Sequence, residues 1–101
     1  MKNIYTWAAQ PAQRNITVGE IIAAKGKKVL TQVTANNALE AKAAEEAGFD
    51  MIIGSAYNVK KVREGSKKLF YTAALELHNY QTAEDVLRGA FTALENGADA
   101  V

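Results

Sequence analysis

Polar side chains that could bind a small ligand gather where three apolar stretches of the sequence end. Thr34 and Asn36 follow the first stretch, Ser55 follows the second, and Glu76 and His78 follow the third. If these stretches are parallel strands, their carboxyl ends meet at one edge of a sheet, where parallel α/β proteins bind ligands. The hydroxyl and amide groups could hold a small anion, while Glu76 beside His78 could bind a metal ion or carry a proton.

Each of these residues also has a structural interpretation. Asn36 or Asn37 can cap the helix that follows, and Ser55 can be a turn residue instead of a group that binds a carboxylate or phosphate. The Glu76-x-His78 pair can lie solvated in a loop without binding anything. The sequence by itself identifies no catalytic residue.

A repeated phrase predicts the elements that position these side chains. Glu46-Ala47-Gly48-Phe49-Asp50 and Glu95-Asn96-Gly97-Ala98-Asp99 each end an alanine-rich stretch with helical periodicity. Glycine suits the left-handed residue just past a helix, and the apolar residues that follow can enter a buried strand. Repeated helix-to-strand corners indicate a parallel α/β fold of the (β/α) barrel type.

The predicted strands lie near residues 29 to 33, 50 to 54, 69 to 75 and 98 to 101, paired in sequence order. A Thr17–Glu20 capping box predicts a first helix from about Val18 to Ala24, after a packing arm at residues 1 to 14. A second helix should bury Leu39, Ala43 and Ala47. A short helix over Val59 to Glu64 and a helix capped by Thr82 complete the set, the last with a buried stripe of Val86, Ala90, Phe91 and Leu94.

Composition favours one ordinary domain over residues 1 to 101, with 49% hydrophobic and 23% charged residues. A formal charge of +1 gives no electrostatic argument for nucleic acid or a membrane surface as a partner. The basic run from Lys60 to Lys68 is interpreted as a solvated surface. The absence of cysteine excludes disulfides and thiolate metal sites, and it fits a cytoplasmic protein. No apolar run is long enough to span a membrane.

Two blocks of the sequence resemble a known family. Residues 16 to 48, with Val33-Thr34-Ala35-Asn36-Asn37 and Glu46-Ala47-Gly48, and residues 62 to 101, with Gly97-Ala98-Asp99-Ala100-Val101, resemble ketopantoate hydroxymethyltransferase. Phosphoenolpyruvate mutase and isocitrate lyase share the general pattern. The resemblance implies the N-terminal half of a TIM barrel, with about four strands. It also implies magnesium, a small 2-oxoacid or other small anion as ligand, and carbon–carbon bond formation or cleavage.

The chain departs from that family at the positions of the metal-binding acids. The family's second strand ends in Gly-Asp-Ser, where this chain has Gly54-Ser55-Ala56, and its third ends in Ala-Asp-Leu-Pro, where this chain has Ala73-Ala74-Leu75-Glu76. Ser55 and Ala74 therefore replace two acids, and Glu76 is the one nearby carboxylate that could replace them. Because magnesium needs carboxylate ligands, we expect weak magnesium binding at most.

Three function classes follow: an active 2-oxoacid enzyme, a binding protein that has lost catalysis, and a structural fragment that self-associates. Half a barrel should leave inward side chains uncovered, among them some of Val29, Leu30, Ile52, Leu69 and Tyr71. The strand near residues 98 to 101 would also lack a neighbour. We therefore expect a homo-oligomer or a companion chain.

Overall fold

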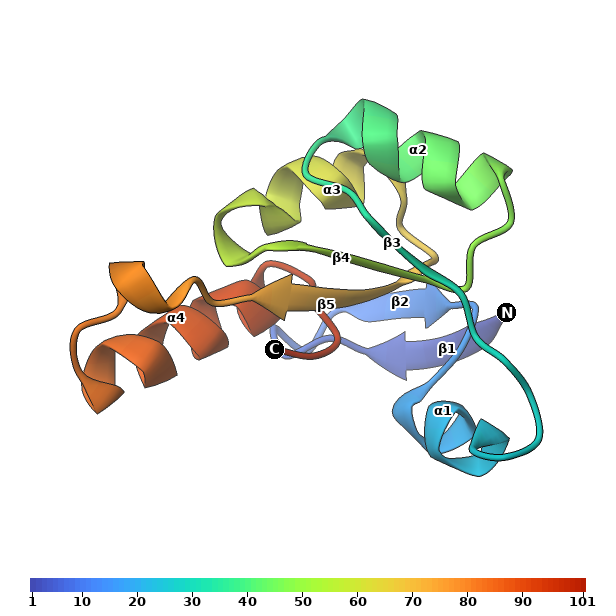
Figure 1. Cartoon of the computed structure of the whole chain (residues 1–101), viewed down its shortest axis with the longest axis horizontal. Coiled ribbons are helices and arrows are strands. Elements are labelled where there is room, and N and C mark those ends of the chain that lie inside the picture. Colours follow the sequence, from blue (N-terminus) through green and yellow to red (C-terminus); the bar gives the residue numbers. More distant parts are fainter.

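The computed structural model describes residues 1–101 and contains a parallel sheet of three strands in sequence order (Figure 1). β3 (Gln32–Thr34) pairs with β4 (Met51–Ser55), which pairs with β5 (Phe70–Ala74). Ala100 then forms a single parallel bridge to Thr72. The parallel α/β class and the strand order are confirmed, the fourth strand is reduced to this bridge, and the structure shows no closed barrel.

Two helices cover one face of the sheet and form the main core with it. α2 (Ala38–Glu46) and α3 (Val59–Gly65) lie side by side above the strands, with a 3₁₀ turn, η1 (Ala56–Asn58), before α3 (Figure 1). Ile52 and Tyr71 are partners in the β4–β5 register, and both are fully buried with Val59 and Val62 of α3. Because side chains alternate along a strand, the opposite face carries Ile53, Ser55, Thr72 and Ala74, which are partly exposed.

This alternation corrects the prediction about inward side chains. Ile52, Leu69 and Tyr71 are buried within this chain, so they need no partner to cover them. Val29 is 86% exposed and lies outside the sheet, because β3 begins only at Gln32. The predicted strand near residues 29 to 33 was therefore placed too early.

The predicted packing arm is a β-hairpin, followed by the expected first helix. β1 (Lys2–Tyr5) pairs antiparallel with β2 (Pro11–Arg14), and α1 (Val18–Ala24) follows the Thr17–Glu20 capping box. Asn15 joins this unit to the sheet, because its side chain donates to Asp50 O at 2.8 Å and accepts from Phe70 N at 3.1 Å. The hairpin thus lies against the amino ends of β4 and β5.

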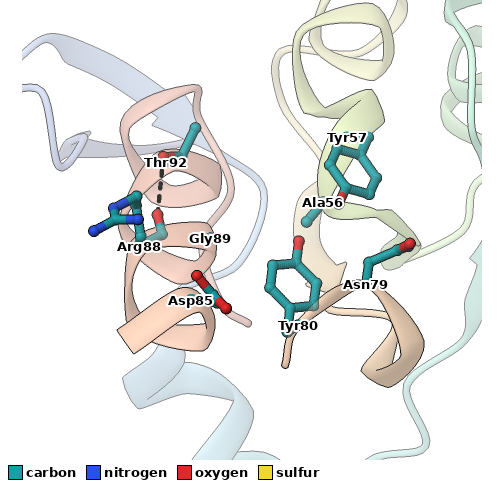
Figure 2. A pocket seen from close by; sticks show the side chains of 8 residues that line it. All are labelled: Ala56, Tyr57, Asn79, Tyr80, Asp85, Arg88, Gly89 and Thr92. Carbon is teal, nitrogen blue, oxygen red and sulfur yellow. Dashed lines mark hydrogen bonds between the residues drawn. The ribbon is translucent and has the colours of Figure 1, made fainter. Parts of the chain in front are cut away.

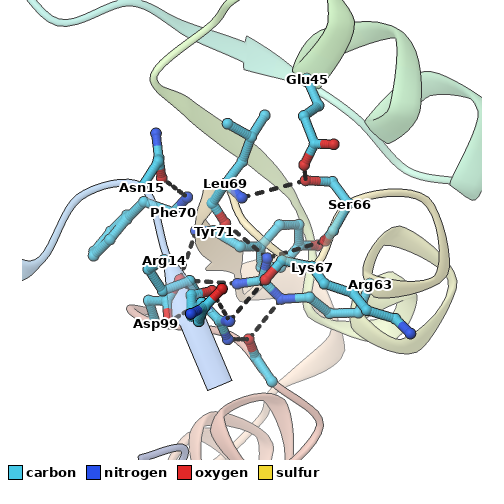
Figure 3. A network of polar contacts seen from close by, with 12 residues as sticks. Arg14, Asn15, Glu45, Arg63, Ser66, Lys67, Leu69, Phe70, Tyr71 and Asp99 are labelled. Carbon is cyan, nitrogen blue, oxygen red and sulfur yellow. Dashed lines mark hydrogen bonds and ion pairs between the residues drawn. The ribbon is translucent and has the colours of Figure 1, made fainter. Parts of the chain in front are cut away.

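Two arginines and one aspartate bind the hairpin, α3 and the C-terminal segment together (Figure 3). Arg14 Nε donates to both carboxylate oxygens of Asp99 at 2.9 and 3.0 Å, and Arg63 Nη2 donates to Asp99 Oδ2 at 2.8 Å. Tyr71 N also donates to Asp99 Oδ2, at 3.0 Å. Arg63 is only 9% exposed, so the prediction that the whole basic run from Lys60 to Lys68 is a solvated surface was wrong at this position.

The predicted apolar stripes of two helices were also wrong. In α2 the buried residues are Ala41 and Ala44, and Leu39 is 79% exposed, because the small alanine face is the one that packs against α3 and the sheet. α4 (Ala83–Glu95) follows the 3₁₀ turn η2 (Leu77–Asn79) and buries only Ala93, leaving Phe91 half exposed beside the edge of the Trp7 ring. Ala90 and Leu94 of the predicted stripe are partly buried, so the apolar face of α4 is only partly covered within this chain.

Candidate functional site

Asn36 and Tyr71 hold the backbone of Ser55 at the carboxyl end of β4. Asn36 Oδ1 accepts from Ser55 N at 2.8 Å and from Asn58 Nδ2 at 3.2 Å, while Tyr71 Oη donates to Ser55 O at 3.0 Å. A β-carbon on Gly54 would overlap the carbonyl oxygen of Ala35 and press on Asn36 Oδ1 and Tyr71 Oη. This close approach requires glycine before Ser55 and gives Ser55 one defined position.

Tyr71 stays protonated because it is buried. Burial raises the pKa of Tyr71 to about 12, with the Arg63 charge opposing the shift and the Glu76 charge adding to it. The Arg63 guanidinium lies over the Tyr71 ring at 5.6 Å from its centroid. Tyr71 is therefore a hydrogen-bond donor to Ser55 at any physiological pH, and it positions Ser55 from the helix side of the sheet.

Ser55 and Ala74 are direct partners in the β4–β5 register. These are the two positions at which the resemblance described above places metal-binding acids. Side chains of paired residues in neighbouring strands point to the same face, here the face opposite α2 and α3. The two positions are thus adjacent on one face of the sheet, and this chain fills them with a hydroxyl and a methyl group.

The hydrogen-bond donors that remain free to bind a ligand at this edge are neutral. Ser55 Oγ accepts from Tyr57 N at 3.2 Å, so its hydroxyl hydrogen is uncommitted, whereas its backbone N–H is already bonded to Asn36. Because Asn36 Oδ1 accepts two donors, the amide nitrogen of Asn36 faces away from them and keeps both hydrogens. Thr34 adds an exposed hydroxyl on β3. We call Thr34, Asn36 and Ser55 the donor edge.

The residues of the donor edge meet only in part. Asn36 touches Ser55 directly, while Thr34 pairs with Ile53, two residues before Ser55 along β4. Asn37, not Asn36, is the cap of α2: its side chain accepts from Glu40 N at 2.8 Å. Asn36 N donates to Glu40 Oε1 at 2.8 Å, which fixes the Asn36 backbone and places one negative charge beside the donor edge.

Glu76 and His78 lie around η2, after β5. The Glu76 carboxylate accepts a hydrogen bond from Asn79 Nδ2 at 3.4 Å, and the His78 side chain is exposed. No three or more histidine, aspartate or glutamate side chains gather into a group that could hold a metal ion. With Ser55 and Ala74 in the acidic positions, the residues present do not fit magnesium, which takes oxygen ligands from one or two carboxylates.

A pocket of about 260 Å³ lies beside the donor edge, between η1, the segment after η2 and α4 (Figure 2). The rings of Tyr57 and Tyr80 stack there with centroids 6.4 Å apart. Tyr80 lies so close to α4 that a β-carbon on Gly89 would be 2.5 Å from its Cε1 atom. Asp85 and Arg88 supply the charged lining on the α4 side. The stacked tyrosines therefore fix the position of α4 relative to β4.

Sequence reasoning missed several residues of this arrangement. Tyr71 and Asn58 position the donor edge, yet they are read from the sequence only as a strand residue and a loop residue. Gly54 carries the one signal that was available, since a glycine inside an apolar strand next to serine suggests close backbone approach. Which backbone approaches it, however, depends on the parallel register.

Comparison with known proteins identifies two curated relatives. The chain is 32% identical over 108 aligned positions to the 3-methyl-2-oxobutanoate hydroxymethyltransferase of Kosmotoga olearia, which covers 85% of this chain and 40% of the relative. It is 31% identical over 108 positions to the enzyme of the same name from Thermosipho melanesiensis, covering 85% of this chain and 41% of that protein. No protein-family model and no solved structure matches the chain. No helix has the length and apolar character needed to cross a membrane. The chain is thus similar over most of its length to two 3-methyl-2-oxobutanoate (ketopantoate) hydroxymethyltransferases, and it spans about two fifths of their length.

Proposed function

We propose that this chain is a ketopantoate hydroxymethyltransferase-like protein whose donor edge binds a small 2-oxoacid or a similar small anion. The observation that carries the proposal is the Ser55–Ala74 register pair, flanked by Asn36 and Gly54, at the carboxyl end of two parallel strands. Both curated relatives act, by their names, on 3-methyl-2-oxobutanoate. The carboxyl ends of such strands are where (β/α) barrels bind their substrates.

Binding at the donor edge rests on neutral hydrogen bonds. A carboxylate or keto oxygen can accept from the Ser55 hydroxyl, the Asn36 amide and the Thr34 hydroxyl. No cation lies in this set, and the Glu40 carboxylate bonded to Asn36 N opposes an anion. We therefore expect weak affinity, with a Kd on the order of 1 mM.

The same residues favour binding without catalysis over an active hydroxymethyltransferase. Stabilising the enolate of a 2-oxoacid with a divalent metal requires carboxylate ligands, and both corresponding positions lack them. We propose that the chain alone holds the ligand but does not transfer a hydroxymethyl group.

An NMR titration with 3-methyl-2-oxobutanoate tests this function. We expect saturable chemical-shift changes of the Ser55 and Asn36 amides. The Kd should rise about fivefold in Ser55→Ala, which removes one uncommitted hydrogen-bond donor. Thr82→Ala is the matched control, because Thr82 caps α4 as Ser55 caps η1 but lies outside the donor edge. Equal effects of the two substitutions, or shifts unaffected by Ser55→Ala, would contradict the proposal.

We also propose that the chain assembles with a second copy of itself, or with a companion chain, through apolar surface that it cannot cover alone. Large side chains stand exposed on the hairpin, η2 and α4: Tyr5, Trp7, Leu77, Leu87 and Phe91. The outer edge of β3 has no strand beside it. Analytical ultracentrifugation should give a mass above 10.9 kDa at micromolar concentration, and Leu87→Lys should shift it toward the monomer. Lys60→Gln on α3 serves as the control, and a compact monomer would contradict assembly.

A further inference from the structure

A second pocket, at the opposite end of the sheet from the donor edge, is lined by positive charge. Its volume is about 370 Å³, and it lies between the β1–β2 hairpin, α3 and Gly97. Arg14, Arg63, Lys67 and Lys68 contribute to its wall, and none of its nine lining residues is acidic. Lys67 and Lys68 are exposed, whereas the two arginines are buried beneath them.

The buried charges beneath this pocket do not balance. Two guanidinium groups share the single carboxylate of Asp99, so one positive charge remains without a partner. Burial lowers the pKa of Arg63 to about 10, with the Arg14 charge as the next contribution, so the two cations repel one another. Glu45, the other acidic side chain of the network, is bonded to Ser66 Oγ on the α2 side and does not line the pocket (Figure 3).

The arginines also keep donor capacity. Each Nη2 carries two N–H groups, yet Arg14 Nη2 donates only to Gly97 O at 3.2 Å and Arg63 Nη2 only to Asp99 Oδ2 at 2.8 Å. Gln13 and Lys67 offer their carbonyl oxygens to Arg14 Nη1, which fixes the Arg14 guanidinium in place. The result is a preorganised cationic floor with two exposed lysines at its rim.

We infer that this pocket binds a small phosphate-type dianion. A dianion compensates the surplus guanidinium charge and one lysine at once, whereas a single carboxylate compensates only one charge. Guanidinium groups hold phosphate oxygens through paired, charge-assisted hydrogen bonds, and lysines attract them as point charges. The volume lies at the lower end of the range for small-molecule sites. This pocket is separate from the donor edge, so phosphate binding here does not depend on ligand binding at the donor edge.

The test is an NMR titration of the full chain with inorganic phosphate at about pH 8, with chloride keeping the ionic strength constant. We expect saturable shifts of the Gln13, Lys67 and Gly97 amides, with a Kd on the order of 1 mM or tighter. Lys67→Gln with Lys68→Gln should weaken binding about tenfold. Only the backbone oxygens of these lysines are used in the fold, so the double variant should keep the native circular dichroism spectrum.

Lys60→Gln with Lys61→Gln is the matched control, because these exposed lysines on α3 carry the same charge and lie outside the pocket. Equal weakening by both double variants, equal shifts with chloride, shifts confined to Ser55 and Asn36, or no saturation would each overturn the inference. A second arm with methyl phosphate separates two sources of the same chemistry. Tighter binding of the ester favours a phosphate monoester as the ligand, equal or tighter binding of inorganic phosphate favours the free ion, and either result supports the site.

Discussion

Replacing Asp99 with asparagine should cost this chain a large share of its stability. The side chain of Asp99 is 10% exposed and accepts hydrogen bonds from Arg14, from Arg63 and from Tyr71 N. Asparagine has nearly the same shape, but it removes the one negative charge that two buried guanidinium groups share. Removing one partner of a buried ion pair costs about 3–5 kcal/mol, because the remaining charge stays buried without compensation. A domain of this size has about 5–15 kcal/mol in total.

Urea unfolding followed by circular dichroism, at one fixed protein concentration, measures this cost. Glu84→Gln is the matched control, because Glu84 pairs with Arg88 at 2.9 Å on the surface of α4, where the two side chains are 80% and 68% exposed. We expect the control to change the free energy of unfolding by less than about 0.5 kcal/mol. A loss in Asp99→Asn below about 1 kcal/mol would refute the reasoning, since it would mean that the two arginines do not need the carboxylate. Failure of Asp99→Asn to fold, while Glu84→Gln folds normally, is the extreme form of the expected result.

Three further predictions concern the carboxyl end of the sheet. Tyr71 has a raised pKa of about 12, so the unfolded chain loses this proton first and stability falls as the pH rises from about 10 to 12. Tyr71→Phe removes this dependence. The difference in the free energy of unfolding between the parent and Tyr71→Phe, measured by urea unfolding, should decrease by about 1.4 kcal/mol between pH about 8 and pH about 11. An unchanged difference would contradict the burial argument. Gly54→Ala should destabilise the chain by about 1–3 kcal/mol, because the new methyl group overlaps Ala35 O. Gly19→Ala on α1 should not destabilise it, because its β-carbon would meet only Thr17 Oγ1, at 4.0 Å. Ser55→Asp with Ala74→Asp should tighten magnesium binding at least about tenfold in isothermal titration, because the two carboxylates would be register partners on one face; a low-micromolar Kd for the parent chain would instead show that other groups bind the ion.

The elements that local chemistry determines could be predicted from the sequence. Gly48 and Gly97 both take positive φ values, 85° and 116°, at the two predicted helix-to-strand corners. The Thr17–Glu20 capping box and the Thr82 cap begin their helices as expected. Each of these features depends on residues within four positions of one another, so the pattern is complete in the sequence itself.

Features that depend on register or on long-range pairing could not be predicted in the same way. The sequence predicts that Arg63 is exposed like the lysines around it, because its partners Gly97 and Asp99 lie 34 and 36 residues further along the chain. The position of β3, which starts at Gln32 and not near Val29, decides which strand residues face α2 and α3. The faces of Ile52 and Tyr71 depend instead on which side of the sheet α2 and α3 cover, and that is set by packing between distant segments.

Serine and alanine at the two positions where the resemblance implies acids are physically compatible with the fold, because the charged groups that hold the fold lie at the other end of the sheet. Two carboxylates at Ser55 and Ala74 would be adjacent partners in a parallel ladder, and without a metal ion they would repel one another. Serine and alanine remove that repulsion and leave the hydrogen bonds of Asn36 and Tyr71 to the Ser55 backbone intact, since those bonds use main-chain atoms. Asp99 forms its ion pairs with Arg14 and Arg63 and accepts a hydrogen bond from Tyr71 N, near the amino end of β5, and these contacts do not involve either position. The carboxyl edge can thus carry neutral donors while the ion pairs near the amino end stabilise the fold independently.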